Sequence, residues 1–261
     1  MEIIDLIPKY ENTYFNCLEE WNEEMKEAGD HKVKWYKKMK NNGLRVKLAR
    51  DDDGNICGMI HYVPSEYSFV DREGFYIVKC IWVHGYKQGV GNQQKKGIGT
   101  ALIEAAEEDC KAMGTKALLA WGVSLPFFMR ASWFKKHGYK KIDKDSTRVL
   151  LWKPFVENVE PPRLVIMKKK PKTIDGKVAI SAFVNGWCPA QNIVFERTKR
   201  AVQEFENSIV MEIYDTTNRM IYNEWGILDG VYIDGKTVQK GPPPSYEKIY
   251  KIIHKKVKKI E

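Results

Sequence analysis

A short turn with two glycines, between an apolar strand pattern and a helical pattern, is the segment of this chain best suited to chemistry. Its residues are Gln94-Lys95-Lys96-Gly97-Ile98-Gly99-Thr100. The N–H groups at the start of a helix have no partner within it, and they attract anions. Gly97 and Gly99 lack a Cβ, so a phosphate oxygen can approach the main chain there. Lys95 and Lys96 add positive charge, and the turn therefore predicts a diphosphate site.

The flanking patterns place this turn between a strand and a helix. Residues 75–83 are rich in β-branched and aromatic side chains, which predicts a strand. After the turn, apolar residues recur at helical spacing up to Gly114, namely Leu102, Ile103, Ala106, Cys110 and Met113. The glycine spacing fits neither a dinucleotide fingerprint nor a nucleoside triphosphate loop. An ordinary glycine turn before an amphipathic helix remains the alternative.

The turn resembles the acyl-CoA loop of the GNAT N-acetyltransferase family, which reads Gln/Arg-x-x-Gly-x-Gly/Ala. Residues 116–121 resemble the family's next strand, and residues 127–139 resemble its following helix. That helix closes with Gly-Phe in the family and with Gly138-Tyr139 here. Three matches in family order predict a GNAT domain of mixed α/β class over residues 1–156.

The resemblance implies that acetyl-CoA is the donor and coenzyme A the product. In the family, the strand before the loop splays from its neighbour and pairs with pantetheine, while the loop holds the diphosphate. The implied cofactor contacts are Ile81, Trp82, Val83, Gln94, Lys95, Lys96, Gly97, Ile98, Gly99, Thr100 and Phe134. The main-chain N–H of Val83 is the group implied to polarise the thioester carbonyl.

The general acid of the reaction is not identified by the resemblance. The family usually has a tyrosine four residues before the closing glycine, and Phe134 stands there. Nearby replacements are Tyr139, Cys80, His84 and His137, with water or unassisted departure of the thiolate as alternatives. His84 is the candidate base, because an imidazole is the side chain type suited to removing an ammonium proton, although a histidine without a role is the alternative. Residues 84–93 hold three glycines and are expected to be mobile over the cofactor or acceptor.

Composition predicts a two-domain globular protein. The chain has 261 residues, 43% hydrophobic and 30% charged, and shows neither a membrane span nor a signal peptide. We therefore expect a cytoplasmic protein with no membrane partner.

The five cysteines have unrelated spacings, which argues against disulfides and a metal site. The net charge of +9 comes from scattered lysines, so a nucleic-acid partner ranks last. The oligomeric state is left open.

Element patterns along the chain indicate the family's mixed sheet and then a second domain. We expect a strand at 2–7, helices at 14–26 and 31–40, a hairpin of 45–49 with 56–63, and a strand at 148–153. A proline-containing basic segment at 157–175 predicts a linker, in which residues 164–167 have a strand pattern. The second domain then covers residues 176–261.

The second domain resembles a thioredoxin fold. Its patterns run strand, helix, strand, helix, hairpin and helix, the last capped by Ser245. Trp187-Cys188-Pro189 resembles the active-site turn of that fold. Gln191 replaces the second cysteine, however, and residues 226–230 lack the fold's cis-proline. Cys188 is therefore either a thiol nucleophile at a helix start or a residue left in a redox-inactive module.

The two resemblances together look like the YoaP-type acetyltransferases. They imply an acetyl-CoA-dependent N-acetyltransferase that acts on a small-molecule amine and carries an accessory thioredoxin-like domain. The alternative is a thiol or redox protein in which Cys188 works and the first domain only binds CoA. A third hypothesis is a nucleic-acid-binding protein.

Overall fold

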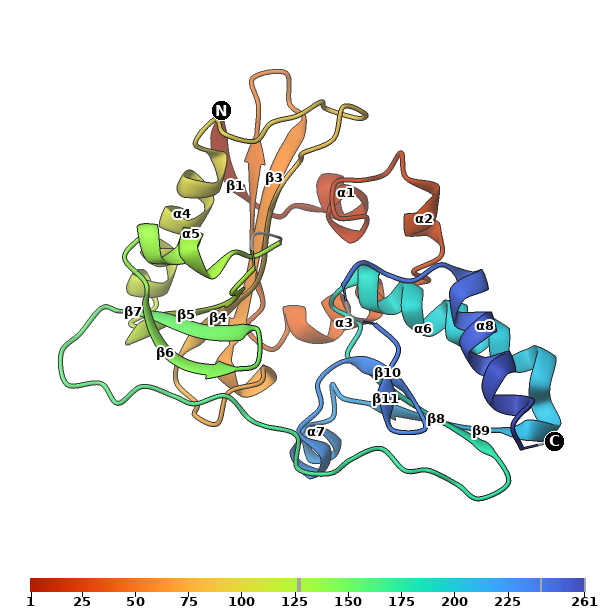
Figure 1. The fold of residues 1–261 in the computed structure, drawn as a ribbon. Coiled ribbons are helices and arrows are strands. Elements are labelled where there is room, and N and C mark those ends of the chain that lie inside the picture. Colours follow the sequence, from red (N-terminus) through yellow and green to blue (C-terminus); the bar gives the residue numbers. More distant parts are fainter. Residues whose placement is uncertain (126–127, 240, 261) are drawn as a thin grey trace. The chain divides into compact units, whose positions relative to one another are not determined.

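The computed structural model describes residues 1–125, 128–239 and 241–260, and its contacts divide the chain into two compact units (Figure 1). The first unit comprises Met1–Trp21 and Lys37–Val165. The second unit comprises Asn22–Tyr36 and Ile166–Glu261. A short N-terminal segment therefore belongs with the C-terminal region, which the boundaries predicted along the sequence do not include.

The first unit is built on one mixed sheet of seven strands in the order β1-β2-β3-β4-β5-β7-β6. The strands are β1 (Glu2–Asp5), β2 (Arg45–Arg50), β3 (Ile56–Pro64), β4 (Tyr76–Val83), β5 (Ala117–Val123), β6 (Lys140–Asp145) and β7 (Arg148–Pro154). The helices of this part are η1 (Pro8–Tyr10), α1 (Glu11–Phe15), η2 (Ser65–Tyr67), α4 (Ile98–Ala112) and α5 (Ala131–Lys136). Helices α2 (Glu23–Lys26) and α3 (His31–Lys40) lie wholly or partly in the segment assigned to the second unit. The predicted mixed α/β class is confirmed.

Helix α4 packs closely on the sheet because β3 presents a glycine to it. A Cβ built on Gly58 would lie 2.8 Å from Cγ2 of Ile98 and 3.0 Å from Cδ1 of Leu102. Of the apolar residues predicted to line the helix, Leu102, Ile103, Ala106 and Cys110 are buried in one core cluster together with Ile98, whereas Met113 is exposed. This contact places the first turn of α4 beside the end of β4.

A partly buried polar cluster ties α4 to two strands. The carboxylate of Asp109 accepts bonds from Arg45 Nε at 2.8 Å and Arg45 Nη2 at 2.6 Å. The hydroxyl of Tyr62 donates to the same carboxylate at 2.5 Å. Burial alone would raise the pKa of Asp109, but the bonds from Arg45 and Tyr62 outweigh burial and hold that pKa below its usual value.

Three details of the first unit differ from the sequence patterns. The helix predicted over residues 14–26 is wrong, because Cys17 and Leu18 have φ values of 51° and 67° and break it into α1 and α2. Residues 164–167 form only an isolated bridge between Val70 and Leu164. Strand β6 was not anticipated, since its mostly exposed residues have no apolar alternation.

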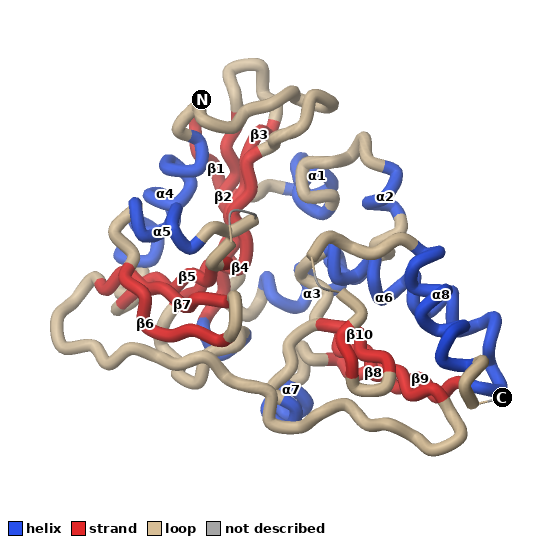
Figure 2. Tube along the Cα trace, in the orientation of Figure 1, coloured by secondary structure: helices blue, strands red, loops and turns tan. Residues whose placement is uncertain are grey.

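The second unit contains a four-stranded sheet in the order β11-β10-β8-β9 (Figure 2). Its elements are β8 (Val178–Val184), α6 (Pro189–Val202), η3 (Gln203–Ser208), β9 (Ile209–Asp215), α7 (Arg219–Trp225), β10 (Gly230–Ile233), β11 (Lys236–Thr237) and α8 (Tyr246–Val257). Strands β8 and β9 are parallel, and β10 is antiparallel to β8. The Ser245 side chain accepts the N–H of Lys248 at 3.3 Å, which confirms the predicted cap of α8.

We predict that Asp109→Asn lowers the free energy of unfolding at neutral pH by about 1–3 kcal/mol, because Arg45 and Tyr62 lose a charged acceptor. A lowered folded-state pKa stabilises the fold above the ordinary carboxyl pKa, and this stabilisation disappears as the pH falls through the folded-state pKa. Urea unfolding should therefore show the two proteins converging only as the pH falls below about 4, through the lowered folded-state pKa. The exposed neighbour Glu108→Gln is the control. Equal stability of Asp109→Asn and wild type at pH 7 would contradict the proposed role of the cluster.

Candidate cofactor site at the end of β4

Strands β4 and β5 run parallel and then part. Their ladder joins Tyr76–Val78 to Leu118–Ala120, although β4 continues to Val83 and β5 to Val123. On its other edge, β4 stays paired with β3 up to the partners Val83 and Gly58. The main-chain groups of β4 that face away from β3 therefore lie outside the β4–β5 ladder beyond Val78. The parting begins at Lys79, two residues before Ile81.

A bulge and a side-chain bond accompany the parting. His61 pairs with Cys80 and Tyr62 pairs with Val78, so Lys79 is the extra residue in β4. Bulges bend a strand and increase its twist. The indole N–H of Trp121 on β5 donates to the Lys79 carbonyl at 2.9 Å. A side chain of β5 thus takes the place of main-chain pairing at this point.

The turn after β4 has the geometry needed to receive an anion. Gly97 is the N-cap of α4 with φ of 79°, and Lys95 has φ of 64°. The first turn of α4 contains no acidic side chain. The N–H groups of such a turn, together with the helix dipole, favour negative charge. These features fit the diphosphate site predicted from the sequence.

Side chains hold the turn against β4 and α5. The amide nitrogen of Gln94 donates to the Val83 carbonyl at 3.4 Å. The Thr100 hydroxyl lies 3.0 Å from Nε2 of His137, whose Nδ1 lies 2.9 Å from the Trp133 carbonyl. His137 is thus engaged through both ring nitrogens, as a support of the turn. Lys96 is exposed, and its Nζ donates to Gln93 Oε1 at 2.9 Å.

The predicted pantetheine strand has different side chains on its two faces. Ile81 and Val83 pack against the core cluster that contains α4. Trp82, between them, points to the opposite face, where its ring centroid lies 6.2 Å from Tyr86 and 6.0 Å from Phe128. The Trp82 indole nitrogen is buried and has no hydrogen-bond partner within the described part of the chain.

His84 is buried, not on the surface, and both of its nitrogens have neighbours. Nδ1 lies 2.8 Å from the Gly91 carbonyl, so this nitrogen carries the hydrogen. Nε2 then accepts the indole N–H of Trp21 at 3.3 Å. A Cβ on Gly89 would lie 2.8 Å from the Trp21 ring, so the segment 84–93 folds tightly against it. In this arrangement the lone pair on Nε2 of His84 already accepts a hydrogen bond from Trp21.

Tyr139 and Cys80, two further acid or base candidates, are also buried. Tyr139 and Phe134 belong to the core cluster with ring centroids 5.6 Å apart, and Phe134 is fully buried. Burial, together with the nearby carboxylate of Glu107, raises the pKa of Tyr139 well above its usual value. Cys80 is buried opposite His61. Phe127, the first residue of the run that resembles the family helix, lies outside the described residues.

Sequence reasoning missed two features near the parted strands. His61 is 1% exposed on the face of β3 away from α4, and its Nδ1 lies 3.2 Å from the Tyr14 hydroxyl. An ionisable residue inside the apolar strand pattern 56–63 was the available signal. The second feature is the contact between Trp21 and His84, which no local pattern reveals because 63 positions separate the two residues.

Cys188 lies in the second unit and is partly exposed. It is the N-cap of α6, and its carbonyl accepts the N–H groups of Gln191 at 3.0 Å and Asn192 at 3.1 Å. The indole N–H of Trp187 donates to Asp229 at 2.6 Å. The predicted position of Cys188 at a helix start is thus confirmed.

None of the described helices is both long enough and apolar enough to cross a membrane. Within the described residues, no three His, Cys, Asp or Glu side chains gather as metal ligands would.

Comparisons with known proteins address the first part of the chain. The model of the acetyltransferase (GNAT) family matches residues 7–139. No match is found among the curated proteins.

Three solved structures illustrate the structural likeness. The GNAT family N-acetyltransferase YhbS from Escherichia coli, in complex with CoA, is 14% identical, with 62% of this chain and 88% of that chain covered and a TM-score of 0.44. PaiA N-acetyltransferase from Thermoplasma acidophilum, with coenzyme A, is 17% identical, with coverages of 59% and 98% and a TM-score of 0.44. Aminoglycoside 6'-N-acetyltransferase from Enterococcus faecium is 16% identical, with coverages of 61% and 100% and a TM-score of 0.42.

The family match spans just over half of the chain and includes the parted strands, the glycine turn and the helix that follows it. The chain therefore belongs to the GNAT family of acetyl-CoA-dependent acetyltransferases.

Proposed function

We propose that this acetyltransferase moves the acetyl group of acetyl-CoA to the amine of a small molecule, at the point where β4 and β5 part. The observation that carries the proposal is the parting itself, which ends beside a glycine turn at the start of α4. Main-chain groups for an extended amide chain and N–H groups for a diphosphate thus lie next to one another.

The residues present fit acetyl-CoA. The first-turn N–H groups of α4 and the Lys96 ammonium would hold the diphosphate, and the edge of Ile81–Val83 would pair with pantetheine. Acetyl-CoA supplies the thioester carbonyl, and the Val83 N–H is the group we assign to polarise it. Phe134 is fully buried, so its proposed contact with the leaving sulfur would need access through the core.

A small acceptor is supported by the aromatic side chains on the face away from α4. Ring contacts connect Trp82 to Tyr86 and Phe128, and Tyr86 to Trp21 at 5.4 Å. Tyr86 and Phe128 are 42% and 41% exposed, so these rings offer apolar contact area at the surface. Aromatic faces also attract ammonium groups.

His84 is the residue we propose to take the proton of the acceptor ammonium. For that step the Trp21 N–H must leave Nε2, because a donor occupies the lone pair that would accept the proton. Tyr139 is a poorer acid for the leaving thiolate, since its raised pKa means that it holds its proton tightly. Cys80 is the remaining candidate.

We propose that the second unit is a thioredoxin-like accessory module. The strand order β11-β10-β8-β9, with β8 parallel to β9 and antiparallel to β10, supports this reading. A second candidate function assigns the work to Cys188, which is partly exposed at the start of α6. Gln191 cannot resolve a mixed disulfide, so that function would need an external thiol.

One experiment decides between these functions. The full chain is incubated with acetyl-CoA and a panel of small amines, and CoA release and acetylated product are both measured. Acetylation of an amine supports the proposal. Cofactor binding without any acetylated amine, combined with thiol exchange at Cys188, would favour the second candidate.

We predict that Gly97→Val weakens acetyl-CoA binding at least about tenfold, or about 1.4 kcal/mol. The added side chain strains a residue whose φ is 79° and covers the N–H groups at the start of α4. The melting-temperature shift produced by acetyl-CoA reports the affinity.

The matched control is Gly114→Val just beyond the other end of α4. Gly114 has φ of 73° and open space around its Cβ position, so it suffers the same backbone strain without facing the turn. If acetyl-CoA raises the melting temperature of both variants equally, the turn does not bind the cofactor.

We also predict that Cys188→Ser changes the free energy of acetyl-CoA binding by no more than about 0.5 kcal/mol and leaves turnover of the best amine nearly unchanged. The thiol lies in the second unit, whereas the parted strands and the glycine turn lie in the first. Steady-state kinetics and a melting curve test this. Lost turnover in a folded variant would mean that the second unit takes part in the transfer.

A further inference from the structure

The glycine turn before α4 is held by a histidine at the end of α5. His137 follows the last residue of α5, and the Thr100 hydroxyl oxygen lies 3.0 Å from its Nε2. The His137 Nδ1 lies 2.9 Å from the Trp133 carbonyl oxygen, and the two ring centroids are 4.0 Å apart. Trp133 also packs against the turn, since a Cβ on Gly99 would lie 3.3 Å from its Cζ2. The imidazole is therefore fixed beside the first turn of α4.

These contacts determine where the hydrogens of the pair lie. A carbonyl oxygen only accepts, so Nδ1 of the neutral His137 ring carries the hydrogen and Nε2 accepts. The single hydrogen of the Thr100 hydroxyl then points to Nε2. Thr100 is the third residue of α4, and its main-chain N–H is one of those without a partner inside the helix. To an anion bound at these N–H groups, the Thr100 hydroxyl can offer only oxygen lone pairs.

A second proton on His137 reverses this arrangement. An imidazolium donates from both nitrogens, so Nε2 would donate to the Thr100 oxygen and release the hydroxyl hydrogen for another acceptor. The same proton places a positive charge at the start of α4, where the helix dipole opposes it and a bound anion favours it. Histidine is the side chain type whose charge changes between about pH 5 and 8.

The other charged side chains around His137 are paired or exposed. They are Lys95 and Lys96 in the turn, Glu104 and Glu107 of α4, Lys135 and Lys136 of α5, and Lys153 of β7. Glu107 and Lys153 form an ion pair at 2.6 Å, so their charges compensate each other. The remaining five are exposed, where solvent and salt weaken their effect. A diphosphate bound at the turn would therefore be the strongest charge acting on the imidazole.

We propose that His137 is a positioning residue of the acetyl-CoA site, which in its protonated form turns the Thr100 hydroxyl toward the diphosphate. Cofactor binding and protonation of His137 then strengthen each other, because a coupling between two binding events acts equally in both directions. Acetyl-CoA should therefore bind more tightly as the pH falls, through the added charge and the added hydrogen bond. This inference rests on the proposed cofactor site at the glycine turn.

The dissociation constant of acetyl-CoA, measured with the full chain at about pH 6 and about pH 8, tests the proposal. We compare wild type with His137→Gln, whose amide cannot take up the proton. The ratio of the constant at the higher pH to that at the lower pH should be at least about threefold larger in wild type. The phosphate monoester of the cofactor also changes charge near about pH 6, but this contribution is the same for both proteins and cancels in the comparison.

The matched control is His254→Gln, which removes a histidine of α8 in the second unit and should keep the wild-type ratio. Thr100→Val lacks the hydroxyl and should lower the ratio, whereas Thr100→Ser should restore it, so the test stands even if His137→Gln does not fold. Equal ratios in wild type and His137→Gln, or in Thr100→Val and Thr100→Ser, with acetyl-CoA bound by all, overturn the role of His137. Failure of wild type to bind acetyl-CoA at either pH would instead overturn the proposed cofactor site.

Discussion

The parting of β4 from β5 is the constraint on which the rest of the candidate site depends. It needs the bulge at Lys79, which changes the course of β4, and the bond from the Trp121 indole to the Lys79 carbonyl, which replaces main-chain pairing. Main-chain donors and acceptors left outside a ladder must find other partners, because an unpaired buried group is costly. An extended ligand with amide groups would meet that need, so the proposed binding of pantetheine and the geometry of the sheet would have the same physical origin.

Helix α4 supplies the N–H groups of the proposed diphosphate site next to the parted strands. Its position is set by the close approach at Gly58 and by the bonds that Arg45 and Tyr62 give to Asp109. The first turn is thereby held beside β4, where its N–H groups can meet a diphosphate. In the proposed site, affinity for the anionic part of the cofactor would thus depend on packing and on a partly buried ion pair several turns away. The positive charge of the chain adds general attraction for such a ligand.

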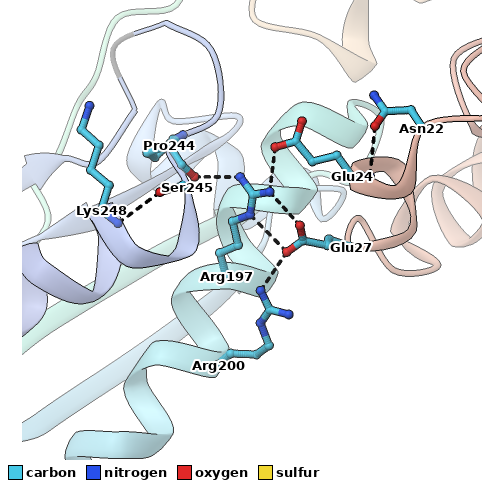
Figure 3. Close-up of polar contacts among 8 residues, drawn as sticks. All are labelled: Asn22, Glu24, Glu27, Arg197, Arg200, Pro244, Ser245 and Lys248. Carbon is cyan, nitrogen blue, oxygen red and sulfur yellow. Dashed lines mark hydrogen bonds and ion pairs between the residues drawn. The ribbon is translucent and has the colours of Figure 1, made fainter. Parts of the chain in front are cut away.

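The sequence allowed the glycine turn before α4, α3, the cap at Ser245 and the order of elements in the second unit to be predicted, because each depends on residues close together in the chain. The break between α1 and α2 could not be predicted from the sequence, because Cys17 and Leu18 adopt positive φ values that neither residue type favours. The burial of His84 and the assignment of Asn22–Tyr36 to the second unit depend on contacts with distant partners, Trp21 and Arg197. Arg197 is buried while its carboxylate partners, Glu24 and Glu27, are partly exposed (Figure 3), so the loss of those partners would leave a buried charge unpaired, and the arginine thus ties two distant parts of the sequence together.

The account is tested most directly by a crystal structure of the full chain with acetyl-CoA. It predicts that the diphosphate accepts hydrogen bonds from main-chain N–H groups between Lys96 and Thr100, while the pantetheine amides pair with β4 over Ile81–Val83. The thioester carbonyl should point to the Val83 N–H. A cofactor held elsewhere, or a diphosphate bound by lysine side chains without the main chain of α4, would contradict the central claim that the parted strands and the glycine turn form the acetyl-CoA site.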